Sequence, residues 1–176
     1  MNTINKTLSF GKKVVGEFKI TKLESDGKGK TVTVQVVRLE KGDYRDYFTY
    51  ENTKKINMGN FFVSKRYKKD QIDYVVEKKS NGKLLGIADC IKSKDELILE
   101  TIGTTKNGKY CGIGRVLLAG IVKDIKGKYP EISVPTPLPS AYGFYKKCHF
   151  DYYDTDYTFC LDEDNFDKLI KDAKQH

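Results

Sequence analysis

Two glycines, Gly112 and Gly114, lie in a segment whose residue types could bind a phosphate group, Lys109 to Arg115 (KYCGIGR). A β-like run from Leu97 to Ile102 precedes it, and an amphipathic helix is expected to follow it to about Lys126. Glycine lets the backbone turn tightly at such a junction, and the first turn of a helix leaves N–H groups without helical acceptors. These groups and the positive end of the helix dipole suit a phosphate-bearing ligand. Helices also begin with glycine for steric reasons alone, so the segment by itself leaves both interpretations open.

Other phosphate-binding motifs do not fit this segment. A Rossmann fingerprint needs a third glycine where Leu117 stands, and a parallel βαβ pattern before it. A P-loop needs Gly-x-x-x-x-Gly-Lys followed by Ser or Thr, which occurs nowhere in the sequence. What remains is a basic-x-x-Gly-x-Gly pattern that starts at Lys109.

This pattern resembles the acyl-CoA-binding signature of the GNAT N-acetyltransferase superfamily, usually Arg or Gln followed by x-x-Gly-x-Gly/Ala. A later segment, AYGFYKKCHF, resembles the family's Ala-x-x-x-Tyr-x-x-x-Gly-Phe helix and strand, with Ala141, Tyr145 and Phe150 in register. The two motifs stand in the expected order about thirty residues apart, which is more specific than either motif alone. The resemblance covers roughly residues 72 to 160.

The resemblance implies an α/β fold of three layers. Helices would lie on both faces of a mixed, mostly antiparallel, twisted sheet that has a splayed pair of central strands. With 176 residues, the chain is expected to form one domain over residues 1–176. Within it we expect a divergent, basic, substrate-side half (1–71), a cofactor-binding core (72–160) and a terminal helix (162–176).

The implied activity is transfer of an acetyl group from acetyl-CoA, the co-substrate, to an amine that attacks it directly. Backbone N–H groups from about Tyr110 to Arg115 would bind the pyrophosphate, and Lys109 takes the place of the usual Arg or Gln. The strand around Ile102 and Thr104 would pair with the pantetheine arm, which would enter where the strands 97–102 and 132–134 separate. The cofactor-binding residues implied are Ile102, Thr104, Lys109, Tyr110, Cys111, Gly112, Ile113, Gly114 and Arg115.

Two catalytic residues are implied as well. Tyr145 corresponds to a tyrosine that faces the CoA sulfur, and a phenol with a pKa near 10 is protonated at neutral pH and can act as a general acid. Glu100 lies on the strand before the glycine segment, where some relatives carry a catalytic base, but its register is ambiguous by one residue. Glu96 is the alternative carboxylate, and some relatives use an ordered water instead.

The sequence departs from the family pattern at three places. His149 replaces the common glycine before Phe150, and Leu138 stands where asparagine often starts the second motif. The segment after Ile102, from Gly103 to Gly108, is about two residues longer than is typical. Because the main cofactor contacts are made by backbone, these departures affect the side-chain assignments more than cofactor binding.

Alternating and apolar runs predict the strands that must position these motifs. The turn Ser25 to Lys30 and the Asn81-Gly82 pair predict hairpins, and short turns predict an antiparallel meander rather than a parallel sheet. The expected strands before the glycine segment are Val14 to Leu23, Thr31 to Leu39, Ile72 to Lys78, Leu84 to Ile91 and Leu97 to Ile102.

After the glycine segment, a helix with one apolar face is expected, and Gly127 marks its end. Prolines after Val134 cannot donate to a strand ladder, so a short strand at 132–134 should end there. A short helix from Ala141 to Cys148 opens at Pro139 or Ser140. A closing hairpin (150–153 and 157–161) and a terminal helix (163–174), capped by Asp162, complete the chain.

Residues 40–71 match no pattern. In the resembling family this place holds one or two helices that shape the acceptor pocket. Aromatic side chains here could stack on bases or line an acceptor cleft, or simply form core. They are Tyr44, Tyr47, Phe48, Tyr50, Phe61, Phe62 and Tyr67.

The net charge of +8 is uneven, with a balance of +9 in residues 1–83 and −1 in residues 84–176. A basic front half could attract an acidic partner such as nucleic acid, or it could be a solvated lysine-rich surface. The acceptor amine could belong to a small molecule, a protein or an aminoacyl-tRNA. The alternative to an enzyme is a catalytically inactive GNAT-like module that binds nucleic acid or a protein partner through this half.

The remaining expectations concern environment. No apolar run approaches the roughly 20 residues that cross a bilayer, and the first ten residues lack the apolar centre of a signal peptide, so we expect a cytoplasmic protein without membrane contact. The four cysteines form no Cys-x-x-Cys pair, and with two histidines they predict free thiols and no metal site. Either a monomer or a homodimer is compatible with the sequence.

Overall fold

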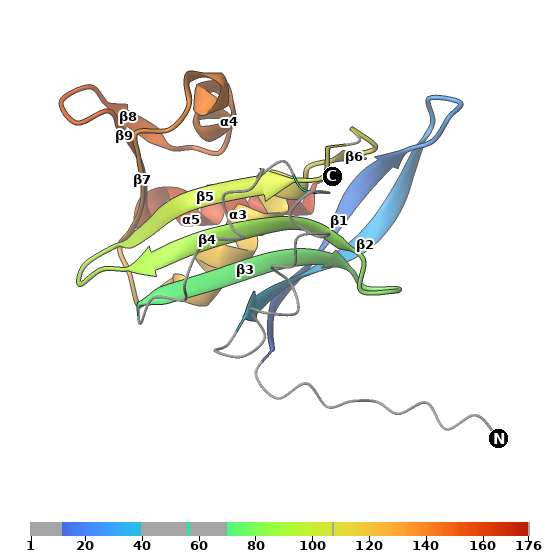
Figure 1. Cartoon of the computed structure of the whole chain (residues 1–176), viewed down its shortest axis with the longest axis horizontal. Helices are drawn as coiled ribbons and strands as arrows, with labels where there is room; N and C mark the ends of the chain where they lie inside the picture. Colours follow the sequence, from blue (N-terminus) through green and yellow to red (C-terminus); the bar gives the residue numbers. More distant parts are fainter. Residues whose placement is uncertain (1–11, 40–55, 57–69, 107, 176) are drawn as a thin grey trace.

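A mixed sheet organises the part of the chain that this computed structural model describes, residues 12–39, 56, 70–106 and 108–175. Its strands follow the order β6-β1-β2-β3-β4-β5-β7-β9-β8 (Figure 1). Every neighbouring pair is antiparallel except β5 and β7, which confirms the mixed, mostly antiparallel sheet. The strands are β1 (Lys13–Leu23), β2 (Gly29–Leu39), β3 (Gln71–Lys78), β4 (Leu84–Lys92), β5 (Leu97–Thr104), β6 (Tyr110–Cys111), β7 (Glu131–Pro135), β8 (Asp151–Tyr153) and β9 (Thr158–Asp162).

Helices α3 (Ile113–Ile125) and α5 (Glu163–Lys174) cover one face of this sheet (Figure 1). A 3-10 turn, η1 (Pro139–Ala141), leads from β7 into the short helix α4 (Tyr142–Lys147). Between residues 40 and 71, the structure describes only Ile56, Asp70 and Gln71. The helices and aromatic side chains considered for this segment therefore lie outside the described residues. No helix in the described part of the chain is long and apolar enough to cross a bilayer. The opposite face of the sheet carries a second buried cluster: Val37, Leu39, Ile56, Val75 and Ile87.

The first five strands pair in sequence order, each antiparallel to the next. β1 and β2 form the first predicted hairpin, and β3 to β5 form the predicted meander. The pairing of β2 with β3 was not predicted. Gly82 occupies the left-handed region in the β3–β4 turn, with φ of 65°, as the Asn-Gly pair requires. The pairing of β6 with the edge of β1 was not predicted, because two residues are too few to carry a periodic pattern.

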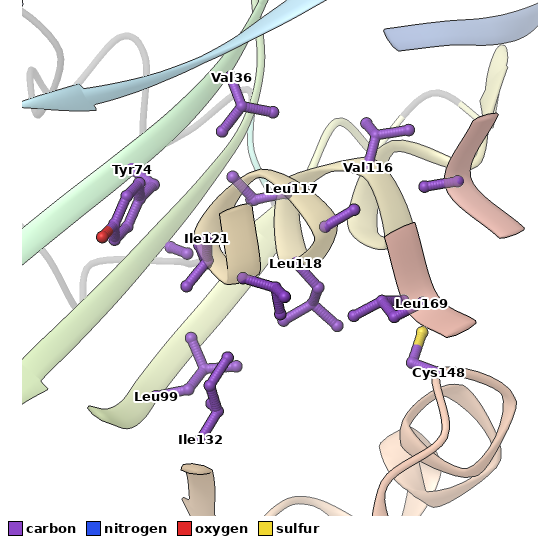
Figure 2. Packing of buried hydrophobic residues seen from close by; sticks show 14 of the residues in the cluster. Val36, Tyr74, Leu99, Val116, Leu117, Leu118, Ile121, Ile132, Cys148 and Leu169 are labelled. Carbon is purple, nitrogen blue, oxygen red and sulfur yellow. The ribbon is translucent and has the colours of Figure 1, made fainter. Parts of the chain in front are cut away.

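Helix α3 is the centre of the core (Figure 2). The predicted apolar face packs on the sheet, and Gly120 lies so close to it that an added Cβ would stand 2.5 Å from Val36. The prediction of one apolar face was incomplete, since Leu118 and Val122 are also buried. Figure 2 shows Leu118 beside Leu169 of α5, which covers the side of α3 that the sheet leaves open.

A buried carboxylate joins α3 to the first strands. Asp124 accepts hydrogen bonds from Lys13 Nζ at 2.8 Å, Tyr74 Oη at 2.9 Å and Arg38 Nη1 at 3.3 Å. Burial alone would raise the pKa of Asp124, but the hydrogen bonds from Lys13 and Tyr74 and the charge of Arg38 outweigh burial and lower it. This carboxylate therefore ties three strands to the end of α3 in its charged form.

The last third of the chain follows the predicted order. Gly127 ends α3 with φ of 77°, η1 and α4 replace the expected helix 141–148, and β8 and β9 form the closing hairpin. Asp162 caps α5 by accepting a hydrogen bond from the Asn165 amide at 3.1 Å, as predicted. One boundary was wrong, because β7 includes Pro135, which stands opposite Thr158 at the last position of the strand. The lost donor costs little there, since the next hydrogen bond across this pair is donated by the Thr136 amide to the Tyr157 carbonyl, at 3.1 Å.

Candidate active site

A cavity of about 680 Å³ opens between β5 and β7. These two strands are partners only at Leu97–Ile132 and Ile98–Ser133, and beyond these residues they separate (Figure 1). The cavity is lined on one side by β5 from Glu100 to Thr104 and on the other by the segment from Val134 to Leu138. The predicted separation of the strands 97–102 and 132–134 is therefore present, and it leaves one edge of β5 without a β7 partner.

The N-terminal end of α3 forms part of the cavity wall. Its N-cap, Gly112, has φ of 90° and no side chain that accepts a hydrogen bond from the helix. The first helical bond runs from the Val116 amide to the Gly112 carbonyl at 3.0 Å, so the amides of Ile113, Gly114 and Arg115 precede the helical ladder. Uncapped amides at the positive end of a helix are suited to an anion, as the glycine segment predicted.

Both glycines of the segment have a steric reason as well. The left-handed conformation of Gly112 is one that residues with a Cβ rarely adopt. Gly114 lies against α4, where an added Cβ would stand 3.0 Å from the ring of Phe144. The steric interpretation is therefore confirmed, and the phosphate-binding interpretation stays a prediction.

The residues just before the helix attach the glycine segment to the sheet. Tyr110 and Cys111 form β6 opposite Lys22 and Thr21 of β1, and the Lys109 carbonyl accepts a hydrogen bond from the Leu23 amide at 2.7 Å. Tyr110 and Cys111 line the cavity, whereas the exposed Lys109 is not among the residues that line it. The role considered for Lys109 in place of Arg or Gln stays a prediction.

Glu100 is the extra residue of a β-bulge in β5. Asp89 of β4 stands opposite Thr101 and Cys90 stands opposite Leu99, so the register shifts by one residue at Glu100. A bulge turns its side chain away from the regular alternation, which explains why the register of Glu100 was ambiguous from the sequence. Glu100 is exposed and lines the cavity, whereas Glu96 lies at the β4–β5 turn and does not line it.

Tyr145 of α4 lies in the cavity wall with only 4% of its surface exposed. Its ring contacts Phe144, Phe150 and Phe159, with centroid separations of 5.2, 5.3 and 5.5 Å. Burial, with smaller contributions from nearby thiols, raises the pKa of Tyr145 to about 12. The phenol therefore keeps its proton at neutral pH, which a general acid requires.

The structure brings nearly all of the candidate residues to one cavity. It also adds three residues that no sequence pattern selects: Thr21 from β1, Thr101, and Thr136 between two prolines. A fourth added residue, Lys147 of α4, carried one signal that was missed, a positive charge two residues after Tyr145. The candidate residues that line the cavity are Glu100, Ile102, Thr104, Tyr110, Cys111, Gly112, Ile113, Gly114, Arg115 and Tyr145.

The chain matches no protein-family model and no curated protein sequence. It is similar to solved structures of low sequence identity. One is the putative N-acetyltransferase YhhK from Escherichia coli bound to coenzyme A (TM-score 0.57, 16% identity, 73% of this chain and 98% of that chain). Another is the ribosomal-protein-S18-alanine N-acetyltransferase from Escherichia coli (TM-score 0.55, 17% identity, covering 73% of this chain and 93% of that chain). A third is a putative acetyltransferase from Exiguobacterium (TM-score 0.52, 15% identity, covering 77% of this chain and 97% of that chain).

Proposed function

The chain has the GNAT acetyltransferase fold, and from this premise we propose that it transfers an acetyl group from acetyl-CoA to an amine. The observation that carries the proposal is the cavity between β5 and β7, which reaches the uncapped N-terminal end of α3. YhhK, a protein of similar fold, was solved bound to coenzyme A. Such an elongated carrier needs an anion site at one end and an open strand edge at the other, and the uncapped end of α3 and the edge of β5 that β7 leaves support this fit.

The cavity fits the two chemically distinct parts of the carrier. The diphosphate would accept hydrogen bonds from the amides of Ile113 to Arg115, and the cavity-lining cations Arg115 and Lys147 add charge complementarity. The amide groups of the pantetheine arm would pair with the edge of β5 at Ile102 to Thr104, which β7 does not cover. These contacts would place the thioester near the bulge at Glu100.

The reaction then needs two proton transfers. The amine nitrogen attacks the thioester carbonyl, a C–N bond forms, and the C–S bond breaks. Glu100, on the bulge, would remove the proton that the amine loses, and the buried phenol of Tyr145 would donate a proton to the departing thiolate. Tyr145 recovers a proton from solvent, so the products are the acetylated amine and coenzyme A. Holding the two reactants in one cavity supplies the remaining rate increase.

The acceptor amine of this proposal could belong to a small molecule, a protein or an aminoacyl-tRNA. The alternative function is a catalytically inactive module that binds nucleic acid or a protein through the basic half. Part of the positive charge of that half is paired locally, since Lys13 contacts Asp124, Lys22 contacts Glu24 and Lys79 contacts Glu17.

Isothermal titration calorimetry with acetyl-CoA tests the proposal, and two glycines provide a matched pair of variants. Gly112 and Gly127 both have positive φ, at 90° and 77°, so alanine strains the backbone similarly at each. Gly112 lines the cavity and Gly127, at the far end of α3, does not. We expect micromolar binding that Gly112→Ala weakens about tenfold or more and that Gly127→Ala leaves unchanged. Absence of acetyl-CoA binding, together with steeply salt-dependent binding of nucleic acid, would instead support the inactive module.

A further inference from the structure

A histidine occupies the turn after Tyr145 at a position where helices usually end with glycine. His149 has φ of 67°, in the left-handed region, and follows the C-cap of α4, Cys148. The His149 amide donates to the Lys146 carbonyl at 3.2 Å, and the Phe150 amide donates to the Tyr145 carbonyl at 3.1 Å. These two hydrogen bonds define a Schellman motif, whose left-handed residue is normally glycine. The replacement of the family's glycine by His149 is therefore a substitution at a conformationally demanding position.

The same motif holds Tyr145 by its backbone and by its ring. The Tyr145 carbonyl accepts hydrogen bonds from the Cys148 amide at 2.9 Å and from the Phe150 amide. The rings of Tyr145 and Phe150 pack edge to face at 5.3 Å, which is the apolar contact that usually accompanies this motif. Any displacement of the turn would consequently displace the phenol in the cavity.

Two neighbouring helices hold the turn in place. The His149 Nε2 atom lies 2.8 Å from Asp172 Oδ2 near the end of α5. The Cys148 side chain hydrogen-bonds Arg115 in the first turn of α3, and it lies beside Leu169 of α5 (Figure 2). Glycine at position 149 would satisfy the backbone equally well but would lack the contact to α5.

We propose that His149 and Asp172 are positioning residues for Tyr145, with their contact fixing the turn and hence the direction of the phenol. The inference rests on the proposed function, because it takes Tyr145 as the acid. Helix α4 has only six residues and no side chain that caps its N-terminal end, so its position depends on tertiary contacts. The His149–Asp172 contact supplies one from outside the cavity.

His149→Gly separates positioning from stability. Glycine relieves the strain of the left-handed conformation, so the unfolding midpoint should stay equal or rise, while kcat falls about tenfold and the Kd for acetyl-CoA stays the same. Asp172→Ala should give a similar loss of kcat. The matched control is Asp167→Ala, which removes a contact of 2.8 Å between Lys126, the C-cap of α3, and α5 away from this turn, and it should leave kcat unchanged.

The Tyr145→Phe background decides whether His149 acts through the phenol. In that background His149→Gly should have no further effect on kcat, whereas a general structural role would lower kcat by the same factor in both backgrounds. Unchanged kcat in His149→Gly would also overturn the inference. Turnover is measured from the CoA thiol that the reaction releases. The amine substrate for this assay is chosen by an acceptor screen.

A measurement that needs no amine acceptor tests the positioning role of His149 independently of the proposed function. In protein labelled with ¹³C at the tyrosine ζ carbon, the Tyr145 signal is the one that Tyr145→Phe removes. We expect His149→Gly to shift or broaden this signal and Asp167→Ala to leave it in place. An unmoved signal in His149→Gly overturns the positioning role. If acetyl-CoA does not bind the wild-type protein, the proposed function fails, and this measurement still decides whether His149 positions Tyr145.

Discussion

Replacing Tyr145 with phenylalanine removes one hydroxyl group from the cavity and leaves the packing of the ring intact. The ring contacts to Phe144, Phe150 and Phe159 do not involve the hydroxyl, so the free energy of unfolding should change by less than about 1 kcal/mol. A positioned general acid contributes about 10²- to 10⁴-fold to the rate. We therefore expect kcat to fall by that factor, which corresponds to about 3 to 5 kcal/mol in the activation barrier.

The pH dependence adds a second requirement for Tyr145. Because burial raises its pKa to about 12, the phenol stays protonated throughout the range in which the protein can be assayed. Any rise or fall of kcat between about pH 6 and pH 9 should therefore persist in Tyr145→Phe, because a group other than Tyr145 causes it.

The assay for this variant combines three measurements. Release of the CoA thiol gives kcat, calorimetry gives the Kd for acetyl-CoA, and urea unfolding gives the stability. A fall in kcat with unchanged Kd and stability is the expected pattern of an interaction made only in the transition state. Wild-type kcat in Tyr145→Phe would refute the assignment of Tyr145 as the acid.

Four further variants test the base, the packing of α3 and the buried carboxylate. Glu100→Gln should lower kcat, while Glu96→Gln should leave it unchanged; the reverse result would assign the base to the turn. Gly120→Ala should cost about 1 to 3 kcal/mol in urea unfolding, because its Cβ would collide with Val36; unchanged stability would contradict the packing of α3. Asp124→Asn should cost about 3 kcal/mol at neutral pH. Since the folded pKa of Asp124 is lowered, its contribution is present above the unfolded pKa and is lost as pH falls through the folded one, so the deficit should shrink in acid; a pH-independent deficit would contradict this.

Local signals account for what the sequence predicted. The Asn81-Gly82 pair predicts a hairpin because its backbone preference is local, and Asp162 predicts a helix start for the same reason. The glycine segment predicted an uncapped helix end, since Gly112 offers no side chain. Each of these features depends on a few neighbouring residues, and the structure has all of them.

Features that depend on distant parts of the chain were missed. β6 exists because Tyr110 and Cys111 meet the edge of β1, about ninety residues earlier in the sequence. The bulge at Glu100 depends on how β5 pairs with β4. The composition of β5 alone does not reveal a shift of one residue in this register. His149 was noted only as a departure from glycine, because its left-handed conformation and its contact with Asp172 are set by the packing of α5.

The central claim is that main-chain amides at the start of α3 bind the diphosphate of coenzyme A. Amide ¹⁵N–¹H NMR tests it directly, with coenzyme A and pantetheine as a matched pair of ligands, because pantetheine lacks the diphosphate. Coenzyme A should shift the amide signals of Ile113, Gly114 and Arg115, while pantetheine should shift mainly those of β5. Binding of coenzyme A that leaves the three α3 amides unmoved would rule out a diphosphate at this end of the helix.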